Sequence, residues 1–477
     1  MPFEKQIEDL ERRRRKALLM GGEKKIKKQH DEGKYTARER IDKLIDPGSF
    51  SEVGMFNHSD MPGMEEKSPA DSKIGGYARI NGRPVGLLAA DFTVLGATSS
   101  RIASRKEGDI RETADRHGFP VIYLGEAGGA RMPDIMGSAG LASYGGGRRD
   151  SFIDHMSRVR KTPLVMAVLG KCYGEPTWMA CLADFVVMVK GTAMGVSGPR
   201  IVSIALGEDI TDEELGGWEL HGTVTGMADR VTEDEDECMQ TIREYLSYMP
   251  AHNEELPPLA PVPDGSGENM PNILDLLPEK RNRTYDMNRI LACVVDRDSL
   301  FPVKPLFGRT VITSLGRVDG RVIGIVANQP QFNAGAMDTD GIEKVMSFLC
   351  LCDSFNIPLV FFEDIPGFLV GREAERRRVG PSHELHERPG PPDGPEDHRY
   401  RAEGLRDGLL EYVRVGERRR FDRRLAYGRD ELCRSDHRGK CGLRRDTGEG
   451  SRGTGRAYRE DGRRNRAVRG GGAALYP

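Results

Sequence analysis

The sequence predicts an α/β protein built from two related lobes, on the strength of an internal repeat and the order of its apolar segments. YARINGRPVG at 77–86 matches LGRVDGRVIG at 315–324, which lies 238 residues further along the chain. The same shift places DRHGFPVIYLGEAGG at 115–129 over DSFNIPLVFFEDIPG at 353–367. Because the shift is constant and needs no gap, we interpret the two regions as copies of one unit.

Each copy has the same order of elements: a strand, a segment of helix length, and a second strand that ends in a glycine turn. The first strand of each copy is expected at 85–90 and 322–327. Near-continuous apolar runs at 164–169 and 185–189 predict strands covered on both faces. The helix of the second copy is indicated by apolar residues at helical spacing, namely Ile342, Val345, Met346 and Leu349.

Composition sets the expected domain boundaries. Residues 1–249 are predicted to form the first lobe, and 284–380 part of a second lobe. The segment 250–283 is rich in proline and poor in apolar periodicity, so it is interpreted as a linker. From 381 to 477 the chain has no Ile and no Met, while Arg, Gly, Asp and Glu dominate.

Length and charge exclude several classes of protein. The chain has 477 residues, too many for one small module, and its net charge of −3 offers no basic footprint for nucleic acid or an anionic membrane. The opening MPFEKQIEDLERRRRKALLM lacks the apolar core of a signal peptide, and no run is long enough for a membrane span, so a soluble cytoplasmic protein is expected. Without a Cys-x-x-Cys pair or histidines at ligand spacing, no metal site is expected.

Two glycine-bearing turns are the candidate chemical sites. GEAGGARM at 125–132 follows an apolar strand, and backbone N–H groups at such a turn can bind phosphate or a developing oxyanion. GKCYGEPTWMACLADF at 170–185 follows another, with a helix expected to start near Pro176. A plain tight turn and an ordinary strand-to-helix loop stay open as alternatives.

No side-chain base can be assembled from the sequence. His117 and His221 are interpreted as structural histidines, and no Ser-His-Asp or Cys-His constellation can be assembled. Oxyanion-type backbone sites without a base suggest that the substrate or cofactor brings its own base.

Six ordered segments, covering roughly residues 10 to 380, resemble the carboxyltransferase (beta) subunits of propionyl-CoA and related biotin-dependent acyl-CoA carboxylases. These are KYTARERIDKLIDPGSF at 34–50, IGGYARINGRPVGLLAADFTVLG at 74–96, GGAR at 128–131, ITDEELGGWELHGTVTGMADR at 210–230, GIVANQPQFNAGAMD at 324–338 and CDSFNIPLVFFEDIPGFLVGREAE at 352–375.

The resemblance implies two crotonase-like (ClpP/crotonase) lobes, assembled into hexamers, with acyl-CoA against the first lobe and carboxybiotin against the second lobe of a neighbouring subunit. Carboxybiotin is supplied by a separate biotin carboxylase and biotin carrier (alpha) subunit, and neither nucleic acid nor a membrane is an expected partner. The freed biotin nitrogen takes the α-proton of the thioester, and the enolate, held in backbone oxyanion holes, attacks carbon dioxide.

The resemblance also implies site residues. The catalytic donors are the backbone N–H groups of Gly174 and Glu175. The residues expected to line the acyl-CoA pocket are Gly128, Gly129, Ala130, Arg131, Gly198 and Pro199. Those expected to approach biotin, the cofactor, are Pro366, Gly367 and Phe368.

One departure from the family falls within the site. The family usually has Gly-Gly-Ala where this chain has Gly174, Glu175 and Pro176. A Glu N–H can still donate, but proline has no N–H and a large side chain stands where glycine gives clearance, so a remodelled acyl pocket is expected. Trp178 either narrows that pocket or packs in the core, and core packing is the favoured interpretation.

The second departure is the tail. The repeat predicts a glycine turn near residue 408, the counterpart of Gly170, but the family pattern stops near Gly380. A disordered tail and a basic nucleic-acid-binding tail are two interpretations, and a reading-frame shift in a GC-rich gene is preferred. The second lobe is then incomplete, and the chain as written is expected to be inactive or unstable.

Two other functions stay open. A biotin-dependent decarboxylase subunit shares the fold, and a catalytically silent scaffold would account for the altered Gly174 turn. The identity of the acyl group is left undetermined.

Overall fold

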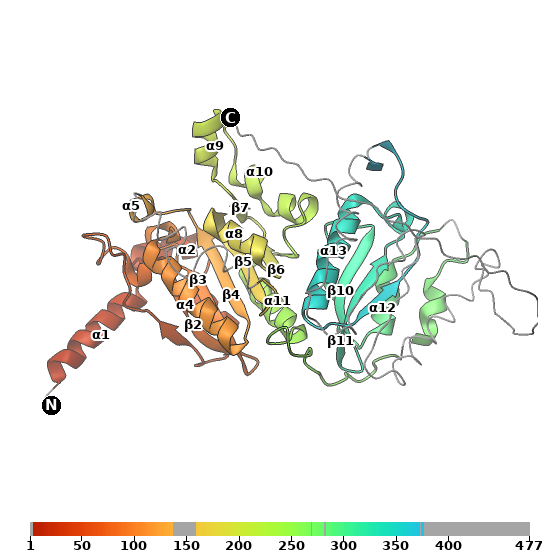
Figure 1. Cartoon of the computed structure of the whole chain (residues 1–477), viewed down its shortest axis with the longest axis horizontal. Coiled ribbons are helices and arrows are strands. Elements are labelled where there is room, and N and C mark those ends of the chain that lie inside the picture. The colour runs from red at the N-terminus through yellow and green to blue at the C-terminus, as the bar shows by residue number, and fades with distance from the viewer. Residues whose placement is uncertain (1–2, 137–158, 269, 281–282, 373, 376–477) are drawn as a thin grey trace, which may run out of the picture. The chain divides into compact units, whose positions relative to one another are not determined.

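The computed structural model describes residues 3–136, 159–268, 270–280, 283–372 and 374–375 (Figure 1). The predicted tail at 381–477 and the turn expected near residue 408 lie outside the described residues. In the described part of the chain, no helix is long and apolar enough to cross a membrane.

The first lobe is built on a mixed sheet in the order β1-β2-β3-β4-β5-β6-β8, with β7 paired to β5. Strands β2 and β3 form an antiparallel hairpin, and from β3 to β8 the neighbours are parallel. The strands are β1 (Ser51–Val53), β2 (Lys73–Ile80), β3 (Arg83–Ala90), β4 (Val121–Ala127), β5 (Leu164–Tyr173), β6 (Phe185–Val189), β7 (Ala193–Gly195) and β8 (Arg230–Thr232).

Helices cover both faces of this sheet. Neighbouring residues point to opposite faces, so Leu87 packs in a core with α3 and α11, whereas Leu88 packs in a core with α4 and α8. Burial on both faces explains the near-continuous apolar runs of β5 and β6, which the sequence predicted as strands. The helices of this lobe are α1 (Glu4–Leu18), α2 (Glu23–Asp31), α3 (Ala37–Leu44), α4 (Arg101–His117), α5 (Met132–Ile135), α8 (Glu175–Leu182), α9 (Pro199–Leu206), α10 (Asp212–Gly216) and α11 (Glu235–Tyr248).

The second lobe contains a four-stranded sheet in the order β12-β11-β10-β9 among its described residues. Strand β12 runs parallel to β11, and the other pairs are antiparallel. The elements are α12 (Met287–Val294), β9 (Phe301–Val303), β10 (Val311–Val318), β11 (Arg321–Asn328), α13 (Thr339–Ser354) and β12 (Leu359–Phe362). A short helical segment at Met270–Leu276 falls within the expected linker.

The structure confirms the duplication. A shift of 238 residues takes the hairpin β2-β3 onto β10-β11 without changing the length of either strand, and α4 and α13 begin at equivalent positions. Lys106 and Lys344 are related by the same shift, and each is buried and donates to two backbone carbonyls at 2.7–3.0 Å. The copies therefore share interior hydrogen bonds as well as sequence.

Candidate functional site

Two glycine turns meet at the carboxyl ends of the adjacent parallel strands β4 and β5. Gly129 follows β4 with a φ of 109°, and Gly174 follows β5 with a φ of 77°. A Cβ atom placed on Gly174 would lie 3.9 Å from the Cα atom of Gly129. Because carboxyl ends of neighbouring parallel strands open at the same sheet edge, the fold brings the two predicted turns into contact.

The Gly174 turn opens helix α8. Gly174 occupies the N-cap position with ψ of −118°, and Pro176 lies in the first helical turn, as the sequence predicted. The Gly174 N–H donates to the Gly195 carbonyl at 3.0 Å. Glu175 is the first residue of the helix, so its N–H has no partner within the helix. Of the two amides predicted as donors, that of Gly174 is engaged with Gly195, whereas that of Glu175 has no partner within its helix.

The loop of Gly128, Gly129, Ala130 and Arg131 is held by backbone hydrogen bonds to its neighbours. The Ser99 N–H donates to the Gly129 carbonyl at 2.9 Å, and the Arg131 N–H donates to the Ser99 carbonyl at 2.8 Å. The Gly128 N–H donates to the Gly96 carbonyl at 2.8 Å. The loop thus runs alongside Ser99, immediately before α4.

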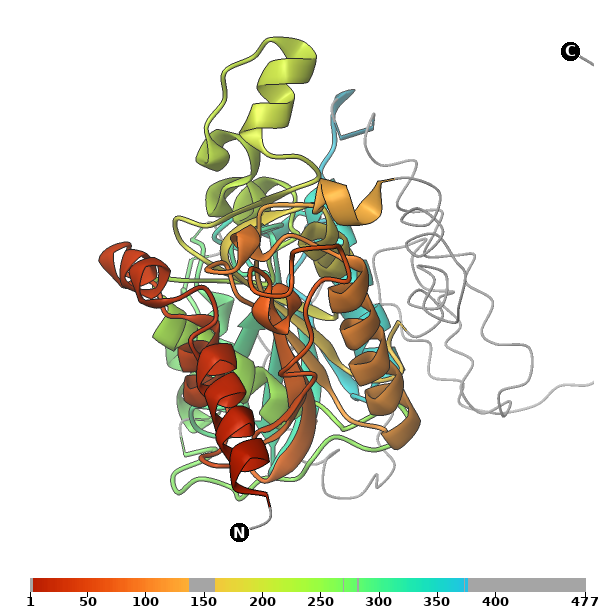
Figure 2. The same ribbon diagram turned by 90° about the vertical axis from the view of Figure 1, so that its left-hand side faces the viewer.

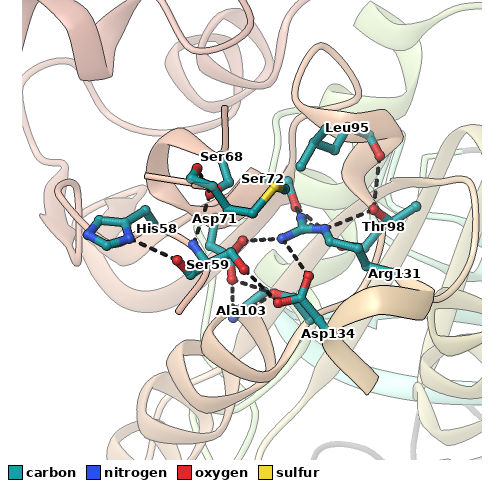
Figure 3. A network of polar contacts seen from close by, with 12 residues as sticks. His58, Ser59, Ser68, Asp71, Ser72, Leu95, Thr98, Ala103, Arg131 and Asp134 are labelled. Atoms are coloured by element: carbon teal, nitrogen blue, oxygen red, sulfur yellow. Dashed lines mark hydrogen bonds and ion pairs between the residues drawn. The ribbon is translucent and has the colours of Figure 1, made fainter. Parts of the chain in front are cut away.

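The side chain of Arg131 points into the protein (Figure 3). This side chain is 6% exposed, and its guanidinium forms an ion pair with Asp71 and donates to the Ser72 hydroxyl and the Thr98 carbonyl, each at 3.1 Å. This arginine was predicted to line the acyl-CoA pocket. The structure places its charge in the interior, so its contribution is to hold the loop rather than to offer a free cation.

Asp71 lies in a strained turn beside the loop. Ala70, Asp71 and Ser72 have φ values of 52°, 48° and 64°, which L-residues rarely adopt in succession. The Asp71 carboxylate accepts hydrogen bonds from the Ser100 hydroxyl and, at 3.2 Å, from the Ala103 N–H, besides its pair with Arg131. Left-handed strain that is overdetermined by contacts in this way is typical of functional sites.

Gly198 and Pro199 reach the same region through Tyr173. A Cβ atom on Gly198 would lie 3.1 Å from the Cδ2 atom of Tyr173, the residue before Gly174. Gly198 caps α9, a helix with no buried residue that stands away from the sheet (Figures 1 and 2). The predicted first-lobe site residues are therefore grouped around the ends of β4 and β5.

Pro366, Gly367 and Phe368 belong to the second lobe. The Met337 N–H donates to the Gly367 carbonyl at 3.2 Å, and the Leu369 N–H donates to the Met337 carbonyl at 2.9 Å. A shift of 238 residues converts this pattern into that of Ser99 with Gly129 and Arg131. The turn predicted to approach biotin is thus the structural counterpart of the loop at 128–131.

The Glu175 side chain joins a buried polar cluster that the sequence did not indicate. Its carboxylate accepts from the Lys73 ammonium at 3.2 Å and from the Ser99 hydroxyl. Lys73 also forms an ion pair with Glu107, whose carboxylate accepts from the Tyr123 hydroxyl at 3.1 Å. These residues come from β2, α4, β4 and α8, so no local spacing relates them. The one sequence feature that could have indicated the cluster is Lys73, a lysine at the first position of an apolar strand.

The cluster gives the carboxyl groups of Glu107 and Glu175 different pKa values. Burial, followed by the negative charge of Glu175, raises the pKa of Glu107 to about 7. Burial also opposes ionisation of Glu175, but the Lys73 cation and the hydrogen bonds to its carboxylate outweigh that effect and lower the pKa of Glu175 to about 2. At neutral pH Glu175 is therefore the anion that pairs with Lys73.

Two single-residue interpretations are settled by the structure. The prediction that Trp178 packs in the core was wrong: the side chain is 46% exposed, because α8 buries Pro176, Thr177, Met179 and Ala180 instead. His221 is a satisfied structural histidine, as predicted. Its Nε2 atom contacts the Met194 carbonyl and its Nδ1 atom the Thr225 hydroxyl, each at 3.0 Å, and burial lowers its pKa.

A duplicated α/β lobe with glycine turns at the carboxyl ends of its strands is the architecture of crotonase-like carboxyltransferases. A solved structure of transcarboxylase 12S has a TM-score of 0.73 and 34% identity to this chain, covering 79% of it and 73% of the other chain. The chain belongs to the carboxyl transferase domain family, whose model matches residues 28–379. That match ends where the composition of the chain changes.

Characterised relatives are similar over the same region. The chain is 37% identical to the carboxyltransferase subunit of propionyl-CoA carboxylase from Haloferax mediterranei, over 80% of this chain and 73% of the relative. It is 36% identical to the alpha subunit of methylmalonyl-CoA decarboxylase from Veillonella parvula, over 78% and 73%. Family membership and the enzyme class, a carboxyltransferase, are thus confirmed.

Proposed function

We propose that this chain is the carboxyltransferase subunit of a biotin-dependent acyl-CoA carboxylase, which moves a carboxyl group from carboxybiotin on a partner carrier protein to the α carbon of an acyl-CoA. The contact between the Gly129 and Gly174 turns carries the proposal, because it places a free helical amide beside a glycine-lined loop. The names of the relatives, propionyl-CoA carboxylase and transcarboxylase, support the same substrate class.

In this proposal the Glu175 N–H donates to the thioester oxygen, which gains negative charge as the α-proton leaves. A donor fixed before the reaction stabilises that charge without reorganising, and the start of α8 adds a favourable dipole. Gly129 lets the loop backbone come close on the opposite side, since a side chain there would require a strained φ of 109°. Carboxybiotin supplies the carboxyl group and the basic nitrogen when bound.

The second lobe is proposed to serve the carrier. Pro366, Gly367 and Phe368 form the counterpart of the acyl-side loop, and this equivalence supports a matching role against the biotin ring. We propose a homo-oligomer, hexameric as the described assembly of transcarboxylase 12S is, with the biotin carboxylase and carrier on separate chains.

A decarboxylase subunit is the second candidate, favoured by the similarity to the Veillonella parvula enzyme. The same oxyanion site would serve the reverse direction, in which a carboxylated acyl-CoA loses its carboxyl group. The direction is decided by the partner subunits, so purification of this chain with its natural partners tests it.

Binding of propionyl-CoA by calorimetry tests the acyl-CoA site. We expect the wild-type chain to bind, and Gly174→Ala to bind about tenfold or more weakly, because a φ of 77° with ψ of −118° strains any L-residue and displaces the Glu175 amide. Gly191→Ala is the matched control, since Gly191 also has a φ of 77° but has nothing within 4 Å of its Cβ position. No binding by the wild type would favour the silent scaffold.

A further inference from the structure

A lysine at the first position of β2 reaches the acyl-side turn through side chains. Lys73 is 1% exposed, and its ammonium contacts the carboxylates of both Glu107 and Glu175. The Glu175 side chain is 17% exposed, although Glu175 opens a helix at the edge of the sheet. A buried lysine is costly unless it is paired, so these contacts keep Lys73 charged in the interior.

The Glu175 side chain is anchored at two points. Besides Lys73, the Ser99 hydroxyl donates to the same carboxylate oxygen, Oε2. The backbone of Ser99 also forms hydrogen bonds with Gly129 and Arg131, which belong to the 128–131 loop. Ser99 therefore ties the Glu175 turn to the 128–131 loop, and Ser99 and Lys73 together restrict rotation of the Glu175 side chain.

Lys73 differs from the buried lysines Lys106 and Lys344, which lie on helices α4 and α13. Both donate to backbone carbonyls at and just before the start of β2 or β10, which is a structural role that both lobes share. The residue equivalent to Lys73 under the 238-residue shift is Val311. The hairpin therefore does not require a charge at this position, and the lysine is found in the first lobe, which contains Glu175.

We propose that Lys73 is a positioning residue, which acts through the Glu175 side chain to hold the Glu175 backbone N–H in line with the thioester oxygen of bound acyl-CoA. The inference rests on the proposed function, because it takes that amide as the oxyanion donor. It also explains how a large residue can occupy a turn where the family usually has glycine: the side chain is drawn inward and its carboxylate becomes the anchor.

The test is the infrared carbonyl stretch of propionyl-CoA, isotope-labelled at the thioester carbonyl and bound to the full chain. A hydrogen bond to that oxygen polarises the carbonyl, so the wild type is expected to move the stretch to lower wavenumber than in water. We expect Lys73→Met to lose the larger part of that displacement. The dissociation constant should change by less than about tenfold, the upper worth of one neutral hydrogen bond.

The controls separate positioning from stability. Lys344→Met removes another buried lysine that donates to the Phe307 and Val311 carbonyls, and it is expected to leave the stretch unchanged. In a Glu175→Gln background, Lys73→Met is expected to add little further change, because the two residues act as a unit. If Lys73→Met does not fold, Ser99→Ala removes the second anchor and is expected to lose part of the displacement.

The outcomes are distinguishable. A full displacement of the stretch in Lys73→Met, or in Ser99→Ala, overturns the positioning role and leaves the proposed function standing. Absence of any displacement in the wild type overturns the proposed function, and this inference falls with it. Loss in Lys73→Met with retention in Lys344→Met supports the inference.

Discussion

Glu107 lies 5% exposed among charged and polar groups from every element around it. Lys73 on β2, Tyr123 on β4 and Glu175 on α8 contact it or interact with its charge, and Lys106 precedes it on α4. Burial, followed by the negative charge of Glu175, opposes ionisation of Glu107 more than the Lys73 cation favours it, so the fold favours the protonated form of Glu107. Its pKa of about 7 lies well above the ordinary value of 4.5.

Glu107→Gln is expected to make the stability of the protein less dependent on pH. Between pH 4.5 and 7 the folded protein holds a proton that the unfolded chain has already lost, so the free energy of unfolding falls as pH rises through that window. The decrease in the free energy of unfolding is complete above pH 7 and is on the order of 3 kcal/mol. Urea unfolding at pH 5 and pH 8 measures it, and the variant should lack this part of the loss.

Some pH dependence should remain in the variant, because burial raises the pKa of Asp184 to about 7 as well. Glu233→Gln is a suitable control, since that side chain is 71% exposed in a surface pair with Lys190. Equal pH dependence in the wild type and in Glu107→Gln would show that Glu107 is ionised in the folded protein at pH 7.

At the scale of elements, the 128–131 loop depends on the buried pair of Arg131 and Asp71. Arg131→Met is expected to destabilise the protein by about 3–5 kcal/mol, because it leaves a carboxylate uncompensated in the interior. The double variant with Asp71→Asn should cost less than the sum of the single changes. Urea unfolding measures both, and propionyl-CoA affinity reports whether the loop keeps its shape.

The surface pair of Lys190 and Glu233 provides the comparison for that cycle. Its loss is expected to cost less than about 1 kcal/mol, as is usual for exposed ion pairs. If Arg131→Met cost no more than Lys190→Met, the loop would be held by its backbone hydrogen bonds alone.

At the scale of the whole molecule, the duplication predicts what the second lobe lacks. The first lobe continues after β4 into β5 and α8, and the same shift places their counterparts after residue 400, where the family match has already ended. We expect that sequencing the coding DNA across residues 370–410 reveals a second frame encoding an apolar strand and a glycine turn near position 408. A chain restored to that frame should transfer carboxyl groups, whereas the chain as written should not.

A chain ending at residue 380 is the control for the tail. If it behaves as the full chain does in propionyl-CoA binding, residues 381–477 add nothing to the acyl-side site. Confirmed DNA with no restoring frame would contradict the frame-shift hypothesis and raise the silent scaffold above the enzyme.

The sequence by itself determined the duplication, the apolar strands β3, β5, β6 and β11, and the two glycine turns of the first lobe. Apolar runs and Pro176 are local signals, and the 238-residue shift is a direct repetition of sequence. Each can therefore be recognised without coordinates. The capping box at Thr211 and Glu214 is a signal of the same local kind, because the hydroxyl and the carboxylate stand three residues apart at the start of α10.

Only the tertiary structure decided which charged side chains pair with one another in the interior. Lys73, Glu107 and Glu175 lie 34 to 102 residues apart, and nothing in the sequence indicates that their side chains meet. Trp178 was placed wrongly for the same reason, since which side of a short helix meets the sheet depends on its packing. Periodicity specifies which residues share a face, but pairing between distant elements arises only when the sheet assembles them, and the electrostatics of this site depend on that pairing.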